Sequence, residues 1–190
     1  MIALSAAEIA AIVGGAVTGA AGTDITETGQ PAPGQAGAFV TGPVVIDSRE
    51  AVPGALFAAL PGERVDGRDF AAVAAKAGAV AVLSHRPIPD LRDVPVIVTA
   101  DVTVALGALA REVLRRLPSA TVIGITGSSG KTSTKDLTAQ VVDRLGPTIA
   151  PAGSFNNELG LPLTVLPFSD AEVAAAALGR HAAGDGTGLS

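Results

Sequence analysis

Short apolar runs alternate with polar, turn-forming segments along the first part of the chain. Val, Leu, Ile and Ala dominate these runs, and runs of this length and composition are typical of buried strands. They cover residues 44–46, 56–60, 79–83 and 94–98. Helix-compatible segments alternate with them, so the pattern predicts an α/β fold with a mixed or parallel sheet.

Three segments of the same part have helical patterns. The first opens with Ser5 and Glu8, which have the spacing of a capping box. The second covers residues 66–76 and the third follows Asp101 to about residue 117. Leucine and valine recur on one side of this third segment, as expected for an amphipathic helix packed on a sheet.

The first 22 residues are apolar enough to raise the possibility of a signal peptide or a membrane span. Glu8 lies in the middle of this stretch, no basic residue precedes it, and Gly14 and Gly15 interrupt it. Each of these features opposes both interpretations. We therefore expect a soluble helix, no membrane insertion and a cytoplasmic protein.

The glycine- and serine-rich sequence Gly127-Ser128-Ser129-Gly130 carries the clearest chemistry in the chain. The apolar residues 122–125 before it predict a buried strand, and residues 131–145 after it are compatible with a helix. Glycines relieve crowding at a tight bend and let backbone N–H groups converge where the positive end of the helix points. This order predicts a phosphate-binding loop, although Ile125 stands where the usual motif has its first glycine.

In such a loop the Lys131 ammonium group would reach the outer phosphates and the Thr132 hydroxyl would bind Mg²⁺. The alternative is an ordinary Gly/Ser turn that precedes Lys-Thr by chance.

The composition of the chain excludes some classes of function. The net charge of −5 and the lack of a basic run oppose nucleic-acid binding. The chain has no cysteine, so disulfides and thiolate chemistry are excluded.

A polar sequence, Asp47-Ser48-Arg49, follows the apolar run at 44–46. A strand that ends in Asp can resemble the Mg²⁺-organising strand of a phosphate-loop protein. That strand should follow the loop, whereas this one precedes it by about eighty residues. Two interpretations stay open: Asp47 and Arg49 pair with each other near solvent, or Ser48 and Arg49 contact an anionic ligand.

Several motifs stand in an order that is more specific than the loop alone. Asp47-Ser48-Arg49 and Asp66-Gly67 precede the loop region 124–135, and Asn156-Asn157 opens the sequence Asn-Asn-Glu-Leu-Gly-Leu-Pro after it. Together they resemble the front part of a Mur ligase, most closely the MurF type, over residues 1–166. MurE-type ligases share the first two motifs and are the alternative within the family.

The resemblance implies an ATP-dependent ligase of peptidoglycan precursor synthesis. Its substrates would be UDP-N-acetylmuramoyl-tripeptide and D-alanyl-D-alanine, joined by an amide bond through an acyl phosphate, with ATP and Mg²⁺ as cofactors. Residues 1–118 would form a mixed α/β domain that binds the UDP-sugar. Residues 119–166 would begin a phosphate-loop domain with a parallel sheet, and 167–190 would form an Ala- and Gly-rich tail. We expect a monomer.

The resemblance also implies roles for individual residues. The ATP phosphates would be bound by Gly127, Ser128, Ser129, Gly130, Lys131, Thr132 and Ser133. Lys131 would be the catalytic residue, neutralising charge on the bridge between the β- and γ-phosphates, and Thr132 would bind Mg²⁺. Ser48 would contact the nucleotide end of the UDP-sugar with Arg49 beside it. Asn156 and Asn157 would lie along the substrate channel, unless they serve only as turn residues.

Beyond residue 166 the sequence departs from the family pattern. A Mg²⁺-binding glutamate, a histidine, a lysine and a third domain are expected there, and the tail does not supply them; His181 is interpreted as a solvent-exposed residue. We therefore expect a truncated chain with little or no ligase activity of its own. A non-catalytic module that binds a UDP-sugar or a nucleotide is one alternative. An unrelated kinase or GTPase is opposed by the lack of an Asn-Lys-x-Asp element.

Overall fold

A five-stranded sheet forms the centre of the molecule. The computed structural model describes residues 2–19, 39–62, 65–117, 120–146, 148, 150–151 and 159–166. The sheet has the order β2-β7-β6-β5-β4, in which β4 to β7 are parallel and β2 runs antiparallel to β7. The strands are β2 Ala16–Thr18, β4 Val44–Val45, β5 Leu56–Ala59, β6 Ala81–Ser84 and β7 Val96–Val98. The predicted α/β fold with a mixed or parallel sheet is therefore confirmed, and the sheet is mixed.

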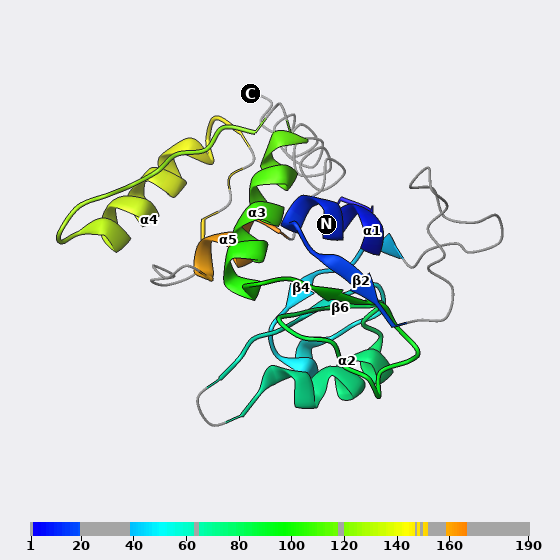
Figure 1. The fold of residues 1–190 in the computed structure, drawn as a ribbon. Coiled ribbons are helices and arrows are strands. Elements are labelled where there is room, and N and C mark those ends of the chain that lie inside the picture. Colours follow the sequence, from blue (N-terminus) through cyan, green and yellow to red (C-terminus); the bar gives the residue numbers. More distant parts are fainter. Residues whose placement is uncertain are drawn as a thin grey trace, which may run out of the picture.

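Successive residues of the central strands face two separate cores, as the period of two in a strand requires. Leu56 and Ala58 of β5 belong to one core, whereas Phe57 and Ala59 belong to the other. The first core is covered by α1 Ala6–Val13 and α3 Val102–Arg115, and the second by α2 Ala71–Ala77 (Figure 1). Two short strands, β1 Leu4–Ser5 and β3 Phe39–Val40, pair antiparallel beside α1.

The local helix signals are confirmed with small changes at the ends. Ser5 and Glu8 form the capping box of α1, and Asp101 caps α3 by accepting hydrogen bonds from two backbone N–H groups. The helix expected at 66–76 is divided, because its first turn is a 3₁₀ helix, η2 Gly67–Phe70, and only the rest is α-helical. The Asp66 carboxylate accepts from the Arg68 N–H, which tightens this first turn.

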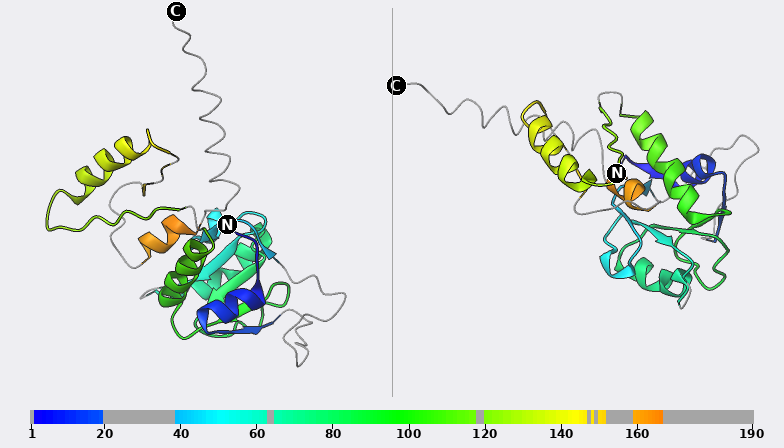
Figure 2. Two further views of the ribbon diagram at one scale, coloured as in Figure 1. Left: turned by 90° about the horizontal axis from the view of Figure 1, so that it is seen from above. Right: turned by 90° about the vertical axis from the view of Figure 1, so that its left-hand side faces the viewer.

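The two helices of the second part of the described chain differ in how they contact the body of the molecule. Helix α4 Lys131–Val142 has no buried residue, and Figures 1 and 2 show it beside the main body. Helix α5 Gly160–Val165 instead packs on α3, and Val165 and Leu166 join the first core. Helix α5 therefore belongs to the body of the molecule, whereas α4 projects from it.

The strand predicted at residues 122–125 is wrong. The stretch is extended but pairs with no strand in the described part of the chain, and Val122 and Ile123 are 66% and 53% exposed. A strand needs a neighbour to satisfy its backbone groups, and composition alone does not supply one.

Within the described ranges, no helix combines the length and the apolar character that crossing a membrane requires. The expectation that the apolar first segment forms a capped helix is confirmed by α1, which ends at Gly14 in the left-handed conformation with a φ of 64°. The tail at 167–190, with His181, lies outside the described residues.

Candidate functional site

The carboxyl ends of the parallel strands bring polar residues to one edge of the sheet. Ser48 follows β4, Asp66 follows β5, and Ser84 ends β6. In open α/β sheets, ligands bind at this edge because loops with free backbone groups gather there. This edge is the first candidate site.

The sequence Asp47-Ser48-Arg49 forms a 3₁₀ turn directly after β4, η1 Ser48–Glu50. Asp47 caps it by accepting from the Arg49 N–H at 2.9 Å, and the Arg49 Nη2 atom lies 2.5 Å from the same carboxylate. Hydrogen bonds from the Arg49 side chain lower the pKa of Asp47 from 3.8 to about 2. Asp47 and Arg49 therefore pair near solvent, as one of the two interpretations expected.

The two candidate substrate-binding residues, Ser48 and Arg49, differ in their exposure to solvent. Ser48 is 7% exposed, whereas the Arg49 side chain is 86% exposed. An exposed guanidinium held by one carboxylate still has N–H groups directed to solvent, since it carries five donors. The geometry is therefore compatible with contact between Arg49 and an anionic ligand, whereas Ser48 is buried.

A second Asp-x-Arg turn repeats this arrangement after β5. Asp66 caps η2, and the Arg68 Nη2 atom lies 2.7 Å from its carboxylate. The side-chain hydrogen bond from Arg68 lowers the pKa of Asp66 to about 2, with a smaller contribution from His85. A Cβ atom at Gly67 would lie 2.7 Å from the Leu60 carbonyl oxygen, so the Asp-Gly sequence is needed for this close turn.

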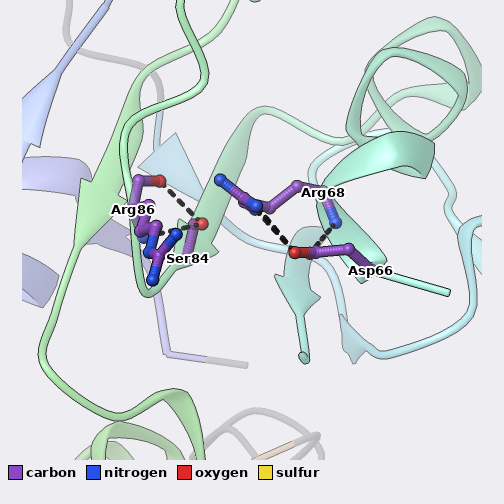
Figure 3. A network of polar contacts seen from close by, with 4 residues as sticks. All are labelled: Asp66, Arg68, Ser84 and Arg86. Carbon is purple, nitrogen blue, oxygen red and sulfur yellow. Dashed lines mark hydrogen bonds and ion pairs between the residues drawn. The ribbon is translucent and has the colours of Figure 1, made fainter. Parts of the chain in front are cut away.

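The neighbouring strand end completes this edge. The Ser84 hydroxyl donates to the Arg86 carbonyl oxygen at 2.8 Å, beside the Asp66–Arg68 pair (Figure 3). The Nδ1 atom of His85 is buried and, among the described residues, has no hydrogen-bond partner. The sequence did not predict that Asp66, Arg68, Ser84 and His85 lie together. The Asp-x-Arg spacing, repeated at 47–49 and 66–68, could have indicated the Asp66–Arg68 pair.

The glycine-rich sequence forms the bend that was predicted. Gly130 has a φ of 76° and Gly127 a φ of 154°, and a Cβ atom at Gly130 would meet no atom within 4 Å. Helix α4 begins at the next residue, and no side chain caps its first turn. Its first N–H groups are thus available at the positive end of a 12-residue helix.

Lys131 folds back over this bend. Its Nζ atom donates to the Gly127 carbonyl oxygen at 2.5 Å and lies 3.4 Å from the Ser128 carbonyl oxygen. The side chains of Ser128, Ser129, Thr132 and Ser133 are exposed around it. One ammonium group, open glycine backbone and a free helix terminus are what a chain of phosphates requires, so the residues present fit a nucleoside polyphosphate.

A divalent cation would have to share its ligands with the phosphates at this loop. The Thr132 hydroxyl is exposed one residue after Lys131, where it could bind Mg²⁺. No group of three or more His, Cys, Asp or Glu side chains that could hold a metal ion occurs in the described part of the molecule. One hydroxyl supplies a single ligand, so a cation held by Thr132 would need bound phosphates as further ligands.

The structure does not bring the two candidate sites together. The loop lies at the outer end of α4, and Figures 1 and 2 show it away from the sheet edge that carries Ser48. Asn156 and Asn157, which were expected beside the substrate channel, lie outside the described residues.

Comparison with known proteins assigns both parts of the chain to one family. Residues 43–120 match the profile described as Mur ligase family, catalytic domain, and residues 125–189 match that of the Mur ligase middle domain. The UDP-N-acetylmuramoyl-tripeptide–D-alanyl-D-alanine ligase of Mycobacterium tuberculosis (strain H37Rv) is 47% identical over 189 residues, covering 87% of this chain and 34% of that protein. The ligase of the same name from Escherichia coli K12 is 46% identical over 123 residues, covering 65% and 26%.

Solved structures agree with the sequence matches. MurF from Acinetobacter baumannii superposes with a TM-score of 0.70 at 30% identity, covering 88% of this chain and 33% of that chain. The MurF ligase from Thermotoga maritima in complex with ADP gives a TM-score of 0.61 at 34% identity, covering 69% of this chain and 30% of that chain. The chain thus spans about a third of the length of the curated relatives first matched.

Proposed function

Because this chain belongs to the Mur ligase family, we propose that it takes part in the ATP-dependent joining of D-alanyl-D-alanine to UDP-N-acetylmuramoyl-tripeptide. The observation that carries the proposal is the bend at 127–130 with Lys131 directed into it, in a chain 47% identical to ligases of that name. The use of Mg²⁺ and a cytoplasmic location are part of the same proposal.

The loop would bind and orient the phosphates of the nucleotide. Bound ATP would supply the phosphoryl group that turns the tripeptide carboxylate into an activated acyl donor. Lys131 would exchange its contacts with the Gly127 and Ser128 carbonyl oxygens for contacts with phosphate oxygens. Its charge would stabilise the negative charge that develops during transfer, which is the main contribution a protein can make to this reaction. Thr132 would hold the cation beside it.

The sheet edge would bind the UDP end of the other substrate. Ser48 lies at the end of β4, and Arg49 presents its guanidinium to solvent beside it. The buried Nδ1 atom of His85, which has no hydrogen-bond partner in the described part of the chain, adds a polar group next to the end of β6. Asn156 and Asn157 remain candidates for the channel between the two ligands.

Two ligands at two separate sites distinguish this function from simple nucleotide binding. Isothermal titration of the chain with ADP and Mg²⁺, and separately with UDP-N-acetylmuramoyl-tripeptide, should give one site for each. Prior saturation with one ligand should leave the other able to bind. Competition between the two ligands, or binding of neither, would contradict the proposal.

A further inference from the structure

Lys135 joins helix α4 to the chain that returns beside it. Its Nζ atom donates to the carbonyl oxygen of Pro151 at 2.5 Å and lies 2.9 Å from the Asp136 carboxylate. The Lys135 side chain is 19% exposed, whereas that of Asp136 is 54% exposed. A charged donor withdrawn from water makes a stronger hydrogen bond to a carbonyl oxygen than an exposed one.

Packing contributes little to the position of α4. None of its residues is buried, and Leu137 and Val141 on its apolar side are 63% and 64% exposed. Most helices in proteins are stabilised by a buried face. The position of α4 therefore depends more on specific polar contacts, such as that of Lys135, than on apolar packing.

The contact lies one helical turn from the phosphate loop. Lys135 follows Lys131 by four residues, so the two side chains project from the same face of α4. After the helix the chain turns, and the Thr148 hydroxyl donates to the Gly146 carbonyl oxygen at 3.0 Å. The chain from Gly146 to Pro151 is five residues long and can reach about 17 Å. The helix between Val142 and Lys135 is only roughly 10 Å long, so Pro151 can come level with Lys135.

We propose that Lys135 is a positioning residue for nucleotide binding. By holding Pro151 across the second turn of α4, it fixes the direction of the helix axis. It thereby sets where the first N–H groups of α4 and the Lys131 ammonium group meet the phosphates. The inference rests on the proposed function of the loop and adds to it a residue that touches no phosphate.

The test compares K135M, which keeps the aliphatic stem, with K135R, which restores a charged donor, and with D136N, which removes only the exposed ion pair. ADP affinity is measured in the presence of Mg²⁺ by titration. K135M should weaken ADP binding about tenfold, because a charge-assisted hydrogen bond is lost. K135R should recover most of the affinity, and D136N should stay within about twofold of the unmodified chain. Equal affinities for K135M and the unmodified chain would overturn the proposal.

Hydrogen exchange separates this proposal from the function on which it rests. Without nucleotide, the backbone N–H groups of residues 134 and 143, which bond within α4, should exchange several-fold faster in K135M and at the original rate in K135R. If the unmodified chain bound no ADP, the proposed function would fail, and the exchange rates would still decide whether Lys135 fixes the helix. Unchanged exchange in K135M would overturn the positioning role in either case.

Discussion

The ammonium nitrogen of Lys131 lies 2.5 Å from the carbonyl oxygen of Gly127, so the first residue of α4 closes the bend from which the helix emerges. This relationship depends on glycine at positions 127 and 130, whose φ angles are both positive. Lys131 is therefore directed at the place where phosphates would lie, and the bend is not absorbed into the helix. Both features are conditions of the proposed nucleotide site.

Stability should depend on acid pH through the paired carboxylates. Asp47, Asp66 and Glu112 each have a pKa of about 2, because arginine side chains donate hydrogen bonds to them. The unfolded chain binds more protons at these groups between about pH 4.5 and 2, so their stabilisation is complete above this window and is lost as the pH falls through it.

D66N isolates one of these pairs, since Asn keeps the capping oxygen but removes the charge. In urea unfolding, the unmodified chain should be slightly more stable than D66N at pH 7, and the difference should shrink between pH 4.5 and 2.5. Added salt should reduce the difference at pH 7, because exposed charges are screened. A difference that stays constant with pH would show that the Arg68 pair does not act through the charge of Asp66.

Substitution by alanine should lower the free energy of unfolding at one glycine and raise it at another. Gly78 has a φ of 119°, and a Cβ atom there would lie 2.6 Å from the Pro53 nitrogen, so G78A should cost about 2 kcal/mol or more. Gly107 lies within α3 with no atom within 4 Å of its would-be Cβ, so G107A should stabilise by about 0.5–1 kcal/mol. Chemical denaturation of both variants measures this, and a gain in stability for G78A would contradict the packing described at Gly78.

The docking of α5 on α3 can be tested with two leucines of similar sequence position. Leu166 is fully buried in the first core, whereas Leu161 is 65% exposed. L166A should lower the free energy of unfolding by about 2–5 kcal/mol, and L161A should change it by less than about 0.5 kcal/mol. Similar small effects of both substitutions would mean that α5 is not part of the core in solution.

The accuracy of the sequence predictions follows the range of the interactions involved. The capping box at Ser5 and the apolar faces of the sheet strands are local patterns, and both were confirmed. The strand at 122–125 was wrong because strand formation requires a neighbour that local composition does not reveal. The split of the helix at 66–76 was missed because the Asp66 carboxylate draws in the Arg68 N–H and tightens the first turn.

The candidate sites divide in the same way. The bend at 127–130 and the orientation of Lys131 come from glycines and a helix start that are adjacent in sequence, and they could be predicted. The association of Asp66 with His85 and Ser84 at one sheet edge depends on the pairing of β5 with β6, which no single stretch of sequence specifies.

We propose that residues 127–133 bind the phosphates of a nucleotide. The most direct measurement is titration of ADP with Mg²⁺ into the unmodified chain and into K131M. K76M serves as the matched control, because Lys76 is an exposed lysine in the last turn of α2. K131M should weaken binding by roughly 10- to 100-fold, because the charged donor directed at the phosphates is lost, and K76M should leave it unchanged. Equal ADP affinity for K131M and K76M would contradict the claim.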